Sequence, residues 1–326
     1  MSKIVKSLLL SAAVLLLGCG TKPASVSRTP ADSLSRGAFN ADSAYAFVAR
    51  QVAFGPRVPG TEAHSDCIHW LVSTLSRFGA SVTMQQGYMP CYDGSQQLVR
   101  NIVAHIPADS AATNLPAVLL VAHYDSRPWT DAEDLYDDRF HGVPAANDGA
   151  SGVAVLLELA RVLAGAAPRP VTILLTDCED MGTPQWYTGP ERENTWCLGA
   201  QYWAQTNTQP YKYGILLDMV GDPNAVFYRE YISEQHAKHI VDRIWHTAGQ
   251  LGYGARFVDQ VAYPITDDHF YITSIAHIPV VDIIHTVPGS DTGFAWWWHT
   301  THDTMDNISS ETLRQVGEVI LLTIYS

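Results

Sequence analysis

Acidic and histidine side chains recur in this chain directly after runs of apolar residues, or at the start of the segment that follows such a run. Carboxylates and imidazoles serve in proteins as metal ligands and as acid–base catalysts. The apolar runs are of the kind expected for β-strands that are buried on both faces of a sheet. The segments that carry the polar groups are His123-Tyr124-Asp125-Ser126, Asn147-Asp148-Gly149-Ala150-Ser151-Gly152, Asp177-Cys178-Glu179-Asp180, Asp218 and Trp298-His299-Thr300-Thr301-His302-Asp303-Thr304.

These five polar segments are expected to meet in space. Open parallel sheets bind ligands at the carboxyl ends of their strands, so side chains that follow successive strands share one edge. Clustered carboxylates repel one another unless a cation offsets their charge, and a mixture of carboxylate and imidazole donors suits Zn²⁺. Taken singly the segments are less specific, because Asp148 could cap the helix that it precedes, and Glu179 with Asp180 could be a solvated acidic pair. Their combination and order favour a divalent-cation site.

The elements that must position these groups alternate between helical and strand patterns, which indicates an α/β protein. We expect three layers, α-β-α, around a mixed, mostly parallel central sheet. A Gly- and Pro-rich turn at 54–60 fits neither regular state. The expected helices cover 42–53, 62–78, 152–163, 198–205, 233–250 and a last one from about 310, and the expected strands cover 99–104, 117–122, 171–175, 214–217 and 279–284.

The composition is that of a folded globular protein, with 47% hydrophobic and 16% charged residues. Residues 40–326 contain no evident linker and are expected to form a single catalytic, zinc-dependent domain. The formal net charge of −13 and the lack of a basic stripe argue against nucleic acid as a partner. An acidic surface instead favours cationic ligands at long range, such as a free peptide amine.

The N-terminus has the features of an export signal. Basic residues precede an apolar run that is too short for a membrane span, which needs about 20 apolar residues. The segment Leu16-Leu17-Gly18-Cys19 looks like a bacterial lipobox, which implies cleavage before Cys19 and acylation of that cysteine. We therefore expect a lipoprotein signal peptide over 1–18, a flexible tether over 19–39, and an exported bacterial lipoprotein anchored to a membrane, in the periplasm or at the cell surface. An ordinary signal peptide with an incidental cysteine is the alternative.

Four further cysteines, Cys67, Cys91, Cys178 and Cys197, follow the signal. Their spacing resembles no zinc knuckle, which argues against a thiolate metal site. Export would permit disulfides, and four cysteines allow three pairings. The sequence does not choose among these pairings.

The five segments, in this order, and the turn Phe54-Gly55-Pro56-Arg57-Val58-Pro59-Gly60 resemble the zinc aminopeptidase family, which also contains the glutaminyl-peptide cyclotransferases of animal and bacterial type. The resemblance covers nearly everything after the tether. It implies that Asp148, Asp180 and His299 hold a catalytic zinc and leave an open position for a substrate oxygen. Most members carry Glu where this chain has Asp180, so the metal or the backbone must shift slightly to meet the shorter side chain.

The resemblance also implies roles for the other polar groups. Glu179 would be the general acid and base. His123 and Asp218 mark the positions that hold a second zinc in the aminopeptidases, whereas the cyclotransferases work with one zinc and Asp218 joins a catalytic hydrogen-bond network. The substrates would be the N-termini of peptides or proteins. A non-catalytic binding lipoprotein on this scaffold would be expected to lack metal ligands, but every expected position carries a plausible one.

Three features favour the cyclotransferase, which converts an N-terminal glutamine to pyroglutamate with release of ammonia. Trp298 precedes the metal histidine, as a tryptophan does in the cyclotransferases, and indole walls suit the flat glutamine side chain. Asp267 resembles the acidic residue that supports the substrate amine. Trp186, after the Glu179-Asp180 segment, resembles a feature of bacterial cyclotransferases and is expected to bind substrate with Trp298. These aromatic residues could instead pack a core, although three consecutive tryptophans cannot all face inward on one strand.

Overall fold

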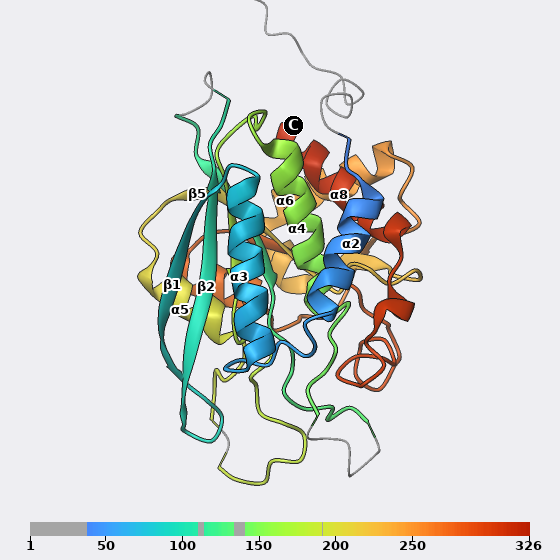
Figure 1. Cartoon of the computed structure of the whole chain (residues 1–326). Helices are drawn as coiled ribbons and strands as arrows, with labels where there is room; N and C mark the ends of the chain where they lie inside the picture. The colour runs from blue at the N-terminus through green and yellow to red at the C-terminus, as the bar shows by residue number, and fades with distance from the viewer. Residues whose placement is uncertain (1–37, 110–113, 134–140, 191) are drawn as a thin grey trace, which may run out of the picture.

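The computed structural model describes residues 38–109, 114–133, 141–190 and 192–326 (Figure 1). The expected signal peptide, the lipobox cysteine Cys19 and all but the end of the tether lie outside the described residues and stay predictions. Phe39, at the end of the expected tether, is buried against Gly317 of helix α8 (Ser310–Tyr325), so the packed part of the chain includes it. None of the helices in the described ranges is both long and apolar enough to cross a membrane.

A six-stranded sheet forms the middle of the molecule (Figure 1). The neighbouring strands β4, β3, β5 and β8 run parallel to one another. β2 pairs antiparallel with β4, and β1 pairs antiparallel with β2 at the edge of the sheet. The predicted mixed, mostly parallel sheet is therefore confirmed. Across the sheet the strands are β1 (Ser81–Pro90), β2 (Gln96–Ile106), β4 (Val171–Thr176), β3 (Ala117–His123), β5 (Tyr211–Asp218) and β8 (Val280–Ile284).

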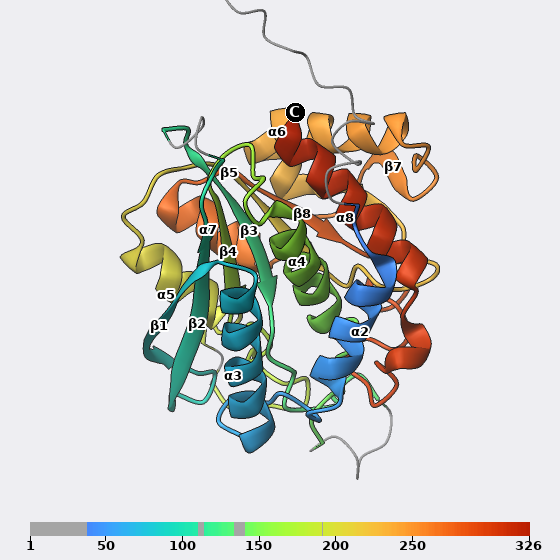
Figure 2. The same ribbon diagram turned by 45° about the horizontal axis from the view of Figure 1, so that its top comes forward.

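Helices cover both faces of this sheet, which confirms the three-layer arrangement (Figure 2). The alternation of side chains along β3 shows why: Leu120 and Ala122 pack into the larger helical layer, whereas Leu119 and Val121 pack into the smaller one. The larger layer contains α2 (Ala41–Val52), α3 (Glu62–Arg77), α4 (Ala150–Leu163), α6 (Tyr231–Gln250) and α8, and the smaller layer contains α5 (Leu198–Thr206) and α7 (Asp268–Ala276).

The predicted helices and strands are all present, and their ends agree with the structure to within three residues. Four of the helices and strands were not predicted: β1, α7 and the short parallel pair β6 (Phe227–Arg229) and β7 (Phe257–Val261). A 3₁₀ turn, η1 (Met305–Asn307), precedes α8. The four cysteines of the described chain are buried and form no disulfide with one another, so none of the three pairings occurs here.

The parallel strands bring the polar segments to one edge of the sheet. His123 is the last residue of β3, Asp218 is the last residue of β5, and the segment 177–180 follows β4. Helix α4 begins beside them because Gly152 lets it approach β5: a Cβ at this position would lie 2.1 Å from the carbonyl oxygen of Leu217. The turn that precedes α4, with Asp148, is thereby held at the same edge.

Candidate metal centre

The three side chains predicted to bind zinc meet at this edge. Nε2 of His299 lies 3.0 Å from Oδ1 of Asp180 and 3.6 Å from Oδ2 of Asp148, and all three residues are buried. A tetrahedral zinc with bonds of about 2.0–2.2 Å separates its ligand atoms by about 3.3–3.6 Å. The observed spacing is therefore close to that of a zinc ligand set, although the metal-binding roles themselves stay predictions.

The electrostatics of the group also fit a cation. Burial acts to raise the pKa of Asp180, but His299, His123 and Arg127 together outweigh it and hold that pKa below its usual value, so the carboxylate stays charged. Its second oxygen, Oδ2, is buried and accepts no hydrogen bond from the described part of the chain. Because a buried charge without a partner is costly, a metal ion between Asp148, Asp180 and His299 would stabilise this arrangement.

His123 and Asp218, the positions predicted for a second metal, lie directly beside the first group. Nε2 of His123 is 2.9 Å from Oδ1 of Asp148 and 3.3 Å from Oδ1 of Asp218. Burial would lower the pKa of His123, but hydrogen bonds with Asp125, Asp148 and Asp218 raise it well above its ordinary value. Asp148 is therefore shared between two groups that each offer one imidazole and two carboxylates.

Glu179, the predicted acid–base residue, lies next to Asp267 and Cys197, and the ligating atoms of these three residues are within 4.8 Å of one another. The thiol of Cys197 donates to Oε1 of Glu179 at 3.0 Å. Burial, together with the charges of Asp180 and Asp267, raises the pKa of Glu179 well above its usual value. Burial and the charge of Asp218 raise the pKa of Asp267 to about 7. Asp267 can therefore exchange a proton in the neutral range, and Glu179 keeps its proton to a higher pH than an ordinary glutamate does.

Two further aspartates position the segments that carry the predicted metal ligands. Asp125 accepts hydrogen bonds from the backbone N–H groups of Glu179 and Asp180, at 3.1 and 3.2 Å. Asp303 accepts from the N–H groups of Asn147 and Asp148, at 2.8 and 3.0 Å. Neither role was predicted. The available signal was their place inside the motif segments, two residues after His123 and four after His299.

Aromatic side chains enclose the imidazole of His299. The ring of Trp298 stacks on it with centroids 3.6 Å apart, and the ring of Trp196 lies nearly parallel to it at 6.1 Å. The guanidinium of Arg127 lies over the ring of Trp196, 4.6 Å from its centroid, and donates to the carbonyl oxygen of Asp180 at 3.0 Å. Trp298 was predicted at the site, whereas Trp196 and Arg127 were not.

The remaining tryptophans take different places. Among the described residues that line the cavity at this edge are Trp196 and Trp298, but not Trp186, which packs edge-on against Trp129 at 6.2 Å. A substrate-binding role for Trp186 stays a prediction that this placement does not support. Trp297 is buried and Trp296 is 70% exposed, so the three consecutive tryptophans do face different ways.

The turn at 54–60 has a structural role beside the site. The buried side chain of Arg57 donates to the carbonyl oxygens of Tyr124, Pro144 and Ala145, at 3.1, 2.8 and 2.6 Å. It thereby links the end of β3 to the segment that leads to Asp148. The Arg in this turn thus positions both segments, although it is not one of the predicted metal ligands.

Metal binding should weaken in acid. Burial and the charge of Asp180 raise the pKa of Asp148 to about 6, and a carboxylate must lose its proton to bind a metal. Burial lowers the pKa of His299, so this imidazole adds no proton competition near neutrality. The zinc affinity can be measured against a chelating dye. Below about pH 6 each carboxylate that must lose a proton to bind zinc should lower this affinity about tenfold per pH unit. Equal affinities at about pH 7.5 and about pH 5 would contradict the assignment of Asp148.

Solved structures of related proteins share this fold over nearly their full length. A Zn-dependent exopeptidase from Parabacteroides distasonis ATCC 8503 is 46% identical with a TM-score of 0.84, and the match covers 88% of this chain and 98% of that chain. A glutaminyl cyclase from Bacteroides thetaiotaomicron, bound to N-acetylhistamine, is 43% identical with a TM-score of 0.83 and the same coverage. The structure named as an exopeptidase and the one named as a glutaminyl cyclase therefore have similar sequence identity to this chain.

Among curated proteins, Aminopeptidase YwaD of Bacillus subtilis (strain 168) is 25% identical over 226 residues, which is 64% of this chain. The chain spans 33 to 40% of the length of three curated relatives, so it corresponds to part of each. Residues 101–324 match Peptidase family M28, and this range contains all five polar segments. The chain belongs to Peptidase family M28.

Proposed function

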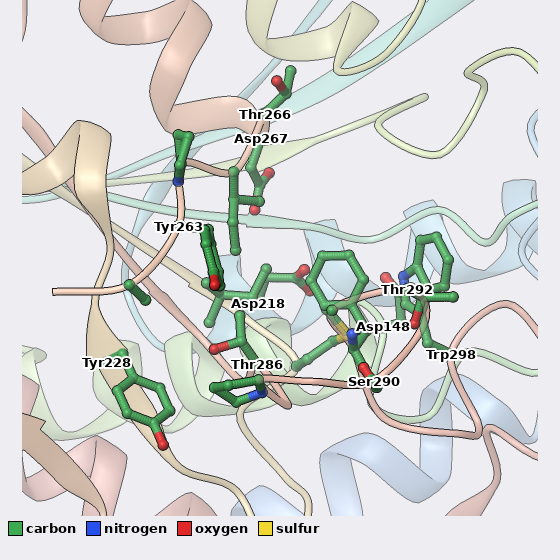
Figure 3. A pocket seen from close by; sticks show the side chains of 18 of the residues that line it. Asp148, Asp218, Tyr228, Tyr263, Thr266, Asp267, Thr286, Ser290, Thr292 and Trp298 are labelled. Atoms are coloured by element: carbon green, nitrogen blue, oxygen red, sulfur yellow. Dashed lines mark hydrogen bonds between the residues drawn. The ribbon is translucent and has the colours of Figure 1, made fainter. Parts of the chain in front are cut away.

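We propose that this protein is a zinc-dependent glutaminyl-peptide cyclotransferase, which converts the N-terminal glutamine of peptides to pyroglutamate and releases ammonia. The observation that carries the proposal is the pairing of two carboxyls, Glu179 and Asp267, beside the predicted metal residues. Both line one cavity with the indole of Trp298. Figure 3 labels Asp267 and Trp298 in this cavity. Cyclisation needs an acid–base group and a support for the substrate amine at one place, and this pair supplies both.

Asp267 and Glu179 have different roles in the proposed reaction. Oδ2 of Asp267 is buried and has no hydrogen-bond partner in the described chain, so it is free to accept from the α-amine of the substrate. The α-amine attacks the γ-carbonyl carbon of the glutamine and gives up a proton to Glu179. The new C–N bond closes the lactam, the bond to the amide nitrogen breaks, and Glu179 returns the proton so that ammonia leaves. A zinc ion held by Asp148, Asp180 and His299 would polarise the γ-carbonyl group.

The indole of Trp298 favours glutamine in this position. Its ring already stacks on His299, so its position is fixed before substrate arrives. A planar, uncharged carboxamide can lie against an aromatic face without the cost of desolvating a charge. Glutamate at the same place would add a carboxylate to an already acidic group and should react poorly.

A two-zinc aminopeptidase is the alternative, and one observation favours it. His123, Asp148 and Asp218 form a second group whose ligating atoms lie within 4.8 Å of one another. If a second metal were held there, the same cavity would suit hydrolysis of the first peptide bond. The cyclotransferase proposal instead assigns Asp218 to the hydrogen-bond network around Asp267.

Two substrates separate these activities. Purified protein with its zinc content measured beforehand is offered a Gln-initiated and a Leu-initiated peptide. The proposal predicts ammonia from the first peptide, no free leucine from the second, and about one zinc per chain. Release of leucine by protein that holds two zinc ions would establish the aminopeptidase instead. If neither product forms with zinc bound, both assignments are wrong.

A further inference from the structure

The cavity extends well beyond the predicted catalytic residues. Its volume is about 970 Å³. Cavities of about 300–1,000 Å³ enclose most of a drug-sized ligand, so one N-terminal residue leaves much of this cavity unfilled. Figure 3 places Trp298 at one side of the cavity and Tyr228 at the other, with Asp148 and Asp218 between them.

Two segments form much of the remaining lining of the cavity. One wall is the end of β7 and the residues after it, 260–266, and the other is the segment 286–294 that follows β8. The first wall presents Val261, which is 47% exposed, and Tyr263, which is 78% exposed, and the half-buried Tyr228 of β6 lines the same cavity. We call these three side chains the distal shelf.

The shelf is chemically unlike the metal centre. It offers two phenol rings and an isopropyl group, whereas the metal centre offers carboxylates and imidazoles. The segment 286–294 lines the same cavity with small uncharged side chains such as Ser290 and Thr292, and Asp291 is its charged residue. Large apolar side chains that remain exposed beside an active site commonly contact a ligand, and tyrosine in particular contributes contact area at low entropic cost.

We propose that the distal shelf binds the side chains of the second and third residues of the peptide substrate and favours aromatic or large aliphatic residues there. The inference rests on the proposed function in that the first residue reacts at Glu179 and Asp267. These groups lie at the buried end of the cavity, so the chain that follows the first residue leaves along the open end, between the two walls. Extended residues advance about 3.3–3.6 Å each, which carries the next two side chains outward over this surface.

Substrates of graded length test the shelf. Glutamine amide has no residue to place there, Gln-Gly-Gly amide has no side chain to place there, and Gln-Phe-Phe amide fills it. The wild-type protein is expected to turn over Gln-Phe-Phe amide with kcat/KM about tenfold above Gln-Gly-Gly amide, mainly through KM. Tyr263→Ala should remove this preference.

Tyr88→Ala is the matched control, because Tyr88 is 68% exposed on β1 and does not line the cavity. It should retain the full preference. The inference is overturned if the wild type shows no preference, if Tyr263→Ala slows all three substrates equally, or if Tyr88→Ala behaves like Tyr263→Ala. If no glutamine substrate releases ammonia, the proposed function fails. The same series begun with leucine and read by leucine release then tests the shelf alone.

Discussion

Replacing Glu179 with glutamine is expected to lower kcat on a Gln-initiated peptide by about 10²- to 10⁴-fold, the usual contribution of a positioned acid–base group. The exchange keeps the size of the side chain and leaves an oxygen that can accept from the thiol of Cys197, which contacts Oε1 at 3.0 Å. It removes only the ability to take up and return a proton. Because Glu179 is not among the predicted ligands, zinc content should stay at the wild-type value.

Zinc analysis and kinetics on the same preparation check this result. Glu311→Gln, an equivalent change on an exposed side chain of α8, should leave both quantities unchanged. A Glu179→Gln protein that cyclises at the wild-type rate would remove Glu179 from the mechanism. A variant that loses its zinc as well would show that this carboxyl supports the metal rather than the proton transfer.

The central sheet is predictable because burial on both faces restricts which residues it contains. β3, β4, β5 and β8 are covered by helices on either side, so their sequences are almost wholly apolar. Once these strands are recognised, the rule that ligands bind at the carboxyl ends of parallel strands locates the site. Asp180 follows the end of β4, whereas Asp148 precedes α4 and His299 lies in the loop after β8, so no local spacing predicts that the three are close. Asp180, though shorter than glutamate, still reaches His299.

The elements that were missed lack such a pattern. α7 contains Phe270, Tyr271, Ile272 and Thr273, residue types that favour strands, yet it is helical and packs against α5. Asp267 begins this helix by accepting from the N–H of Asp268, so the residue predicted for the substrate amine also caps α7. The edge strand β1 is half exposed and polar, and its composition resembles that of a loop.

Side-chain contacts within loops were the least predictable part of the site. Trp186 and Trp196 both follow the Glu179 segment, and only the path of the intervening chain decides which one reaches the cavity. The residues between the two tryptophans show no helical or strand periodicity from which this path could be predicted. Arg127 likewise pairs with Asp131 four residues later, a spacing that is common on protein surfaces, but here it is buried and supports Asp180. Such contacts depend on tertiary packing, which no single segment encodes.

Replacing His299 with alanine is expected to abolish zinc binding. The change removes the only imidazole of the group that contains Asp148 and Asp180 and leaves two buried carboxylates to repel each other. Loss of a partner outside the ligand set typically weakens metal binding by about 10–100-fold, so loss of a ligand should exceed that. Elemental analysis after gel filtration should give about one zinc per wild-type chain and almost none for the variant.

Thermal unfolding provides the second readout and the control. A ligand present at 100 times its Kd stabilises the folded state by about 2.7 kcal/mol, which corresponds to a shift in Tm of about 5 °C or more. Chelation should therefore lower the Tm of the wild type but leave that of His299→Ala unchanged. His302→Ala, a change three residues along at an exposed histidine that contacts Trp296, should keep both the zinc and the chelator response. If His299→Ala retains zinc and its Tm still falls on chelation, the ion is held elsewhere. Asp148, Asp180 and His299 would then not be the metal centre.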